Sequence, residues 1–153
     1  MTLVRASIDI DAPPEQVYDL ALDPARLNEW VTIHRRVNSR DAGGPREGYE
    51  MNQTLCLRGA NFKVSWTLTE AERPDRATWE GRGPAHSYAR TSYALKPLDG
   101  NKTRFEYENE FKAPGGFLGA AASRMRIGGV PEREATRSLQ RLKALLENGK
   151  GAG

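Results

Sequence analysis

The sequence predicts an α+β fold, in which an antiparallel sheet of about seven strands is followed by a long C-terminal helix. Apolar and polar residues alternate almost without a break from residue 48 to residue 112, which is the period of half-buried strands. After Gly115-Gly116, apolar residues recur at three- and four-residue spacing up to Leu146, as they do along one face of a helix. The predicted element order is one strand, two short helices, six strands and a helix.

The first thirty residues predict the opening strand and both short helices. Residues 6–11 alternate, so the apolar side chains of this strand share one face. Pro13-Pro14 ends the strand and supplies the fixed φ of a helix start. That helix ends before Asp23-Pro24, because a residue that precedes proline is pushed out of the α region. A second helical turn over residues 26–30 then places Trp30 as an apolar anchor.

Five strands are predicted between residues 49 and 111, with turns at 59–61, 73–76, 83–85 and 97–101. Such a meander has one dry face and one wet face. A further strand is predicted over residues 31–39, where strict alternation points Arg35 inward and His34 outward. The residues predicted to face inward on the other five strands are Tyr49, Met51, Gln53, Leu55, Leu57, Phe62, Val64, Trp66, Leu68, Ala77, Trp79, Gly81, Ala89, Thr91, Tyr93, Leu95, Thr103, Phe105, Tyr107, Asn109 and Phe111.

The opening segment IDIDAPPEQVYDLALDPARLNEW, together with the element order, resembles the START-like or Bet v 1-like (SRPBCC) superfamily. That superfamily includes the polyketide cyclase/dehydrase and lipid-transport proteins. The resemblance covers nearly the whole chain and implies a helix-grip fold, in which a curved sheet and one long helix enclose an apolar cavity. We expect a single domain over residues 1–148 and a flexible tail over 149–153.

The composition restricts the classes of partner that we expect and indicates the cellular compartment. No segment approaches the roughly 20 consecutive apolar residues of a membrane span, and the N-terminal residues lack the apolar core of a signal peptide. The single Cys56 excludes an internal disulfide and is typical of a reducing compartment, so we expect a cytoplasmic location. The net charge of +3 is too small to indicate nucleic-acid binding. The arginine-rich last helix indicates either a weak contact with anionic surfaces or an ordinary solvated face.

Several polar residues fall on the inward side of the strands, as in cavities that bind small molecules. The alternative for each of them is ordinary core packing, with its polar group bonded locally. Met125 lies beside Gly128-Gly129, where a helix kink would either open the cavity mouth or let the helix pass close to the sheet. The predicted ligand-binding residues are Arg35, Met51, Gln53, Leu55, Phe62, Val64, Trp66, Trp79, Thr91, Tyr93, Tyr107, Asn109 and Met125.

Three residues are candidates for chemistry at such a site. Tyr93 and Tyr107 could act as acids or bases, and Arg35 could hold an enolate, a phenolate or a carboxylate. The alternative for Arg35 is that it extends to water. No metal or cofactor is expected, because the chain has only two histidines and no nucleotide-binding glycine motif.

The residues and the resemblance together favour the binding of a hydrophobic small molecule, such as a polyketide or a lipid, by a monomer or a homodimer. A polyketide aromatase/cyclase is the first alternative, although NEWVTIHRRV differs from the WPELFSEY pattern of those enzymes. This segment looks closer to small actinobacterial START-like proteins. These suggest two further alternatives, enediyne self-resistance by sequestration and a toxin–antitoxin component.

Overall fold

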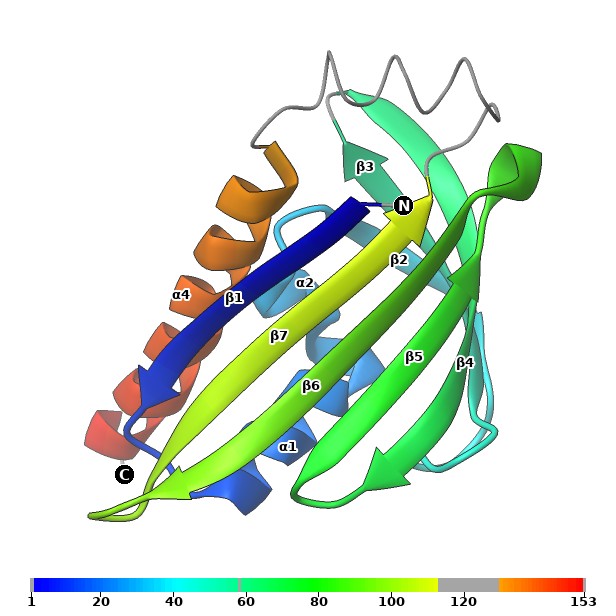
Figure 1. Cartoon of the computed structure of the whole chain (residues 1–153). Coiled ribbons are helices and arrows are strands. Elements are labelled where there is room, and N and C mark those ends of the chain that lie inside the picture. Colours follow the sequence, from blue (N-terminus) through cyan, green and yellow to red (C-terminus); the bar gives the residue numbers. More distant parts are fainter. Residues whose placement is uncertain (1, 58, 113–129, 153) are drawn as a thin grey trace.

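The computed structural model describes residues 2–57, 59–112 and 130–152. Figure 1 shows one curved sheet with its helices gathered on one side. The elements are β1 (Thr2–Ile10), α1 (Pro14–Leu22), the 3-10 turn η1 (Pro24–Arg26), α2 (Leu27–Trp30), β2 (His34–Arg40), β3 (Glu50–Leu57), β4 (Ala60–Glu72), β5 (Arg76–Arg82), the 3-10 turn η2 (Pro84–His86), β6 (Tyr88–Leu98), β7 (Lys102–Lys112) and α4 (Val130–Ala152).

The sheet has seven strands in the order β1-β7-β6-β5-β4-β3-β2, and every neighbouring pair is antiparallel. Strands β2 to β7 form a meander, and β1 joins it beside β7. Helix α4 packs along β1 and against α2, so the helices cover the concave face (Figure 1). The predicted α+β helix-grip fold is confirmed.

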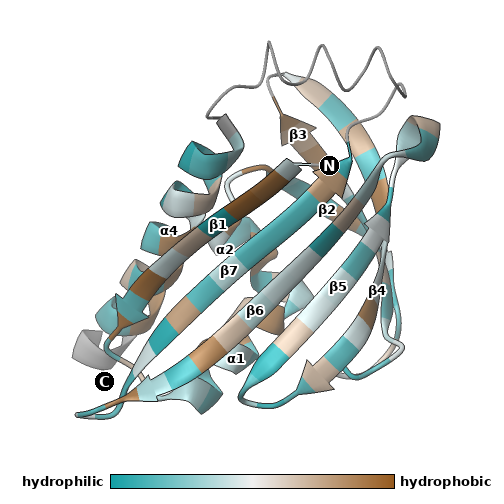
Figure 2. Cartoon of the chain, viewed as in Figure 1, coloured by the Kyte–Doolittle hydropathy of each residue, from teal (hydrophilic) through white to brown (hydrophobic). Residues whose placement is uncertain are grey.

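The alternation predicted along the strands accounts for the core. Residues directly opposite each other in an antiparallel pair share a face, and Tyr93 lies opposite Tyr107 just as Leu95 lies opposite Phe105. The bands of hydrophilic and hydrophobic residues that follow one another along the strands in Figure 2 are this pattern. Leu95 and Phe105 are buried in one hydrophobic cluster with residues of α1 and with Trp30 of α2.

The prolines of the opening segment act where the sequence predicts. Pro14 is the first residue of α1, where its missing N–H costs no hydrogen bond. The helix ends at Leu22, and the extended ψ of 111° at the next residue, Asp23, is the conformation that Pro24 imposes. The Asp23 carboxylate then accepts a hydrogen bond of 2.9 Å from the Ala25 N–H and begins the next turn.

Strand β2 differs from the predicted strand in its start and in its alternation. It begins at His34, and its register against β3 shifts on both sides of the pair Arg36-Val37. Each shift inserts an extra residue into the strand, so His34 lies opposite Leu55 and shares its inner face. Arg35 is the extra residue of the first bulge, and its side chain is exposed. The inward orientation predicted for Arg35 is therefore wrong, as is the outward orientation predicted for His34.

The helix kink and the flexible tail were both expected in the C-terminal third of the chain. Met125 and the Gly128-Gly129 kink lie outside the described residues. Helix α4 runs to Ala152 and so includes residues 149–152, and the flexibility expected of that tail stays a prediction.

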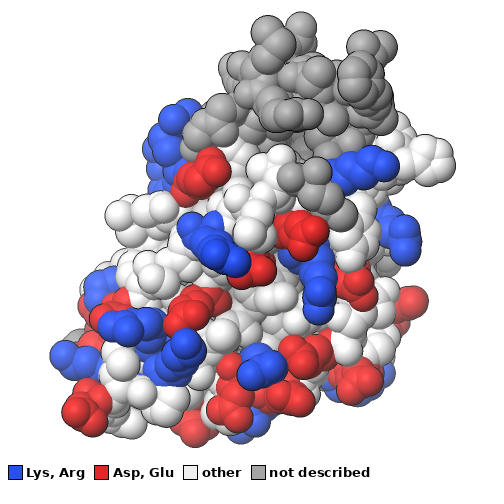
Figure 3. All heavy atoms as spheres, in the orientation of Figure 1, with Lys and Arg blue, Asp and Glu red and all other residues white. Residues whose placement is uncertain are grey.

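The convex face of the sheet carries both signs of charge. In Figure 3, basic and acidic side chains are interspersed over this face. Arg104 of β7 pairs with Asp9 of β1 at 2.9 Å, and Lys96 of β6 pairs with Glu106 of β7 at 2.9 Å. Among the helices that the structure describes, none combines the length and the apolar character needed to cross a membrane.

Candidate functional site

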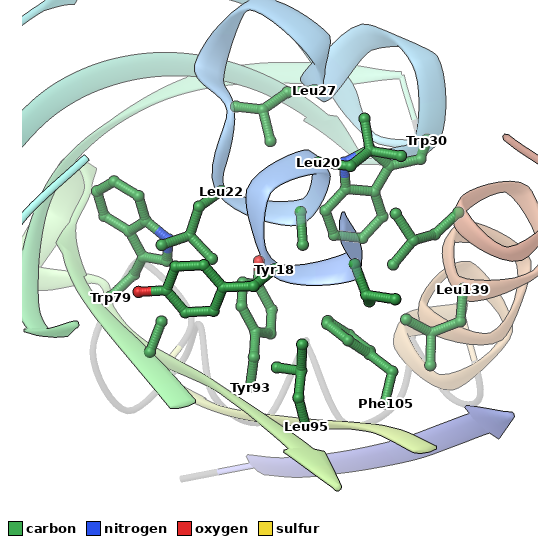
Figure 4. Packing of buried hydrophobic residues seen from close by; sticks show 14 of the residues in the cluster. Tyr18, Leu20, Leu22, Leu27, Trp30, Trp79, Tyr93, Leu95, Phe105 and Leu139 are labelled. Carbon is green, nitrogen blue, oxygen red and sulfur yellow. The ribbon is translucent and has the colours of Figure 1, made fainter. Parts of the chain in front are cut away.

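A cavity of about 770 Å³ lies between the concave face of the sheet and the helices. Strands β3 to β7 supply one wall, which we call the sheet wall. Helices α1, α2 and α4 and the segment Val31–Ile33 supply the other, which we call the helix wall. Figure 4 shows side chains of both walls, with Trp79 and Tyr93 on strands facing Leu22, Trp30 and Leu139 on helices. Both walls are mainly apolar.

The structure brings together every predicted site residue that lies on β3 to β7. Arg35 does not line the cavity, because the β2 bulge turns it to solvent. Met125 lies outside the described residues. The predicted residues that line the cavity are Met51, Gln53, Leu55, Phe62, Val64, Trp66, Trp79, Thr91, Tyr93, Tyr107 and Asn109.

The polar part of the sheet wall is a group of four side chains on β6 and β7. Thr91 lies opposite Asn109, and Tyr93 lies opposite Tyr107 one inward position further along. The Thr91 hydroxyl donates to Asn109 Oδ1 at 3.1 Å. The rings of Tyr93 and Tyr107 stack with their centroids 6.1 Å apart. The two phenols thus stand side by side on the cavity surface.

Both phenols are weak acids in this setting. Burial raises the pKa of Tyr107 to about 12, and the neighbouring Asn109 side chain opposes part of that rise. Burial raises the pKa of Tyr93 further, and the nearby Tyr107 adds to the effect. Both groups therefore keep their protons at neutral pH, which suits them to donate hydrogen bonds rather than to act as bases.

A second polar group joins the sheet wall to β2. Trp66 Nε1–H donates to Gln53 Oε1 at 2.8 Å, which fixes the orientation of the Gln53 amide. The Gln53 Nε2 group then faces His34 Nδ1 at 2.8 Å. Since an amide nitrogen only donates, Nδ1 must accept, and His34 is the neutral tautomer with its proton on Nε2. Burial lowers the pKa of His34, which favours the same neutral form.

A third polar group, on the helix wall, was missed by the sequence analysis. Thr32 Oγ1 donates to Glu134 Oε2, and the Thr32 N–H donates to Ser138 Oγ at 3.1 Å. The two hydroxyls lie 3.2 Å apart, so Ser138 can donate to Thr32. Ser138 falls on the apolar stripe of α4 beside Leu139, and a polar residue there was the one available signal. No feature of the sequence pattern indicates that Glu134 or Thr32 belongs to the site.

Within the residues that the structure describes, the polar groups of the lining are neutral hydrogen-bonding groups, one carboxylate and one ammonium. Glu134 is that carboxylate, and Lys112, at the end of β7, is the one cation in the lining. No group of three or more potential metal ligands occurs in the described part of the chain. The arrangement can enclose an apolar molecule, donate hydrogen bonds to it from one wall and accept one on the other.

Two known proteins are similar to this chain in sequence. The chain is 29% identical over 83 residues to Toxin Rv0910 of Mycobacterium tuberculosis, a match that spans 54% of this chain and 58% of the toxin. It is 25% identical over 131 residues to the uncharacterized protein Rv1546 of the same organism, spanning 85% of this chain and 92% of that protein.

Solved structures share the fold over its whole length. A conserved protein from Geobacillus kaustophilus has a TM-score of 0.74 at 17% identity, covering 96% of both chains. DynU16, a putative protein in the dynemicin biosynthetic locus, has a TM-score of 0.62 at 16% identity, covering 96% of this chain and 48% of that one. The family model for polyketide cyclase/dehydrase and lipid transport matches residues 1–147, and the chain belongs to that family.

Proposed function

We propose that this protein binds a hydrophobic small molecule in the cavity between the sheet wall and the helix wall. The observation that carries the proposal is the cavity of about 770 Å³, a volume within the range of small-molecule sites. The transfer of an apolar ligand from water into a mainly apolar cavity is favourable, and the few hydrogen-bonding groups of the lining can orient the ligand. Membership of the polyketide cyclase/dehydrase and lipid transport family supports the same role.

Cyclase chemistry is the second candidate, and one observation favours it. Two protonated phenols, Tyr93 and Tyr107, line the cavity side by side and could stabilise a developing enolate. An aldol closure also needs a base that removes a proton from carbon. The base would have to be Glu134, the carboxylate of the described lining, which stands on the opposite wall. Binding requires no such pairing and is therefore our main proposal.

Two narrower roles follow from similarity alone. The match to Toxin Rv0910 covers about half of each chain, so a toxin role for this protein is a separate hypothesis. Growth of a host that expresses the chain tests it, since a toxin arrests growth and a binding protein does not. Sequestration of an enediyne is a special case of binding, and the titration described next includes that ligand class.

The proposal is tested by titration with aromatic polyketides, an enediyne core and fatty acids. All three tryptophans line the cavity, so saturable quenching of their emission reports binding. Mass spectrometry of each sample separates the roles, because a binder leaves the ligand mass unchanged and a cyclase removes water. Absence of quenching by every ligand would refute the proposal.

A matched pair of variants on β6 tests whether the ligand binds inside the cavity. Ala89 lines the cavity, whereas Ala94 lies on the opposite face of the same strand. We expect Ala89→Phe to fill part of the cavity and weaken binding by about ten-fold or more, a loss of about 1.4 kcal/mol. Ala94→Phe adds the same side chain outside the cavity and should leave the affinity unchanged.

A further inference from the structure

The two walls of the cavity offer opposite hydrogen-bonding roles. On the sheet wall, Asn109 Oδ1 is occupied by the Thr91 hydroxyl, which leaves the Asn109 N–H groups for the neighbouring Tyr107 oxygen. The Tyr107 oxygen can therefore accept from Asn109 while its own proton remains available. Within the described residues, no acceptor within hydrogen-bonding distance takes the proton of Tyr93 or Tyr107. The sheet wall thus presents two phenol donors to a ligand.

The helix wall presents an acceptor. Glu134 Oε2 accepts from Thr32, and this bond holds the carboxylate at the cavity lining. Its other oxygen, Oε1, has only a long contact of 3.6 Å with Arg137 Nη1. The Glu134 side chain is 26% exposed, so much of its surface is removed from water. Glu134 Oε1 consequently has lone pairs left for a donor group on the ligand.

We propose that the cavity selects a neutral apolar ligand with an acceptor oxygen at one end, bound by Tyr107, and a hydroxyl at the other, bound by Glu134. This inference rests on the proposed function and narrows it. A ketone or quinone oxygen meets the phenol donors, and an alcohol meets the carboxylate. The same arrangement disfavours fatty acids and other carboxylates, since the Glu134 carboxylate repels a second negative charge and its ion pair with the exposed Arg137 is long, at 3.6 Å.

The cation in the lining does not reverse this preference. Lys112 stands at the end of β7 and is exposed. Exposed ion pairs are screened by water and salt and contribute about 0–1 kcal/mol. A carboxylate ligand would therefore gain little from Lys112 and would still meet Glu134.

Four probes with one tricyclic core test the inference. Anthracene has no oxygen, anthraquinone has the acceptors alone, 2-(hydroxymethyl)anthraquinone adds a neutral donor, and anthraquinone-2-carboxylate replaces that donor with a charge. We expect the affinities, measured by tryptophan quenching, to rise in the order anthracene, anthraquinone, hydroxymethyl probe. Each step should be about three- to ten-fold, the usual net effect of one hydrogen bond. The carboxylate should bind more weakly than the hydroxymethyl probe.

Two variants test which wall binds which group of the ligand. Tyr107→Phe should reduce the advantage of anthraquinone over anthracene, since Tyr93 is then the one phenol donor left, and should leave anthracene binding unchanged. Glu134→Gln should weaken the hydroxymethyl probe and strengthen the carboxylate, a change of opposite sign that unfolding cannot produce. Glu132→Gln, on the same helix and exposed, is the control and should change neither affinity.

The outcomes separate this inference from the proposed function. Equal affinities for all four probes would overturn the selection by Tyr107 and Glu134 and leave the apolar cavity as a binding site. A Glu134→Gln variant with unchanged affinities would overturn the role of the helix wall. Binding of none of the four probes, together with no quenching by the ligands of the first titration, would refute the proposed function itself.

Discussion

Replacing Gly81 by alanine should destabilise the protein, because Trp66 occupies the space that a side chain would need. Gly81 of β5 lies directly opposite Trp66 of β4. A Cβ atom at residue 81 would stand 2.5 Å from Trp66 Cε3, 2.7 Å from Trp66 Cζ3 and 2.7 Å from Val64 Cγ1. Carbon atoms pack at about 3.5–4.0 Å, so both neighbours would have to shift by about 1 Å.

The Trp66 ring cannot make this shift without a cost. Its Nε1–H donates to Gln53 Oε1 at 2.8 Å, and both side chains are buried. Overpacking of a core costs about 1–3 kcal/mol. Loss of the indole hydrogen bond adds about 1 kcal/mol. We therefore expect Gly81→Ala to lower the free energy of unfolding by about 2–4 kcal/mol and to push the indole into the cavity.

Urea unfolding, followed by circular dichroism and tryptophan emission, measures this change. Gly44→Ala is the control, because a Cβ there would meet no atom within 4 Å and the residue lacks a positive φ. We expect the control to stay within about 0.5 kcal/mol of the wild type. A Gly81→Ala variant as stable as the control, with unchanged emission and ligand affinity, would refute the close fit between Gly81 and Trp66.

Two further predictions concern buried polar groups. The Thr103 hydroxyl donates to the Ala12 carbonyl at 2.7 Å, and both residues are fully buried. Thr103→Val should therefore lower the free energy of unfolding by about 1–3 kcal/mol, and Thr103→Ser should lower it less; equal losses would contradict a role for the hydroxyl. Burial lowers the pKa of His34 below its usual value of 6.5, so the unfolded chain binds more protons as the pH falls. Stability should be constant above that value and decrease as the pH drops from 6.5 to the folded-state pKa. In urea unfolding between pH 7.5 and pH 5, His34→Asn should reduce the decrease, and an identical decrease in the variant would exclude His34 as its source.

The parts of the fold that follow local rules could be predicted from the sequence. Period-two alternation gave the inner face of β3, β5, β6 and β7, and of β4 as far as the bulge after Leu68, because a strand keeps one parity wherever it has no bulge. The helix boundaries at Pro14 and Asp23 follow from the fixed φ of proline. The cavity residues of those strands followed from the same parity, together with the family resemblance.

The errors have a different physical origin. The β2 bulges carry no glycine and no other local signal, so strict alternation assigned Arg35 to the wrong face. The helix wall depends on where α4 meets the segment after α2, a contact between residues more than 100 positions apart. Glu134 and Thr32 therefore lie beyond what a single periodic pattern can indicate.

The first bulge of β2 also provides a partner for a buried polar group of the cavity lining. It turns His34 to the inner face, where Nδ1 faces the Gln53 amide at 2.8 Å. Without that acceptor, a buried Gln53 amide would lack a partner for its N–H groups, at a cost of about 1–3 kcal/mol. The Trp66 N–H would still hold Gln53 Oε1, so the unsatisfied group would be the Nε2 side of the amide. One extra residue in an edge strand thus completes the hydrogen bonds of a buried amide in the cavity lining.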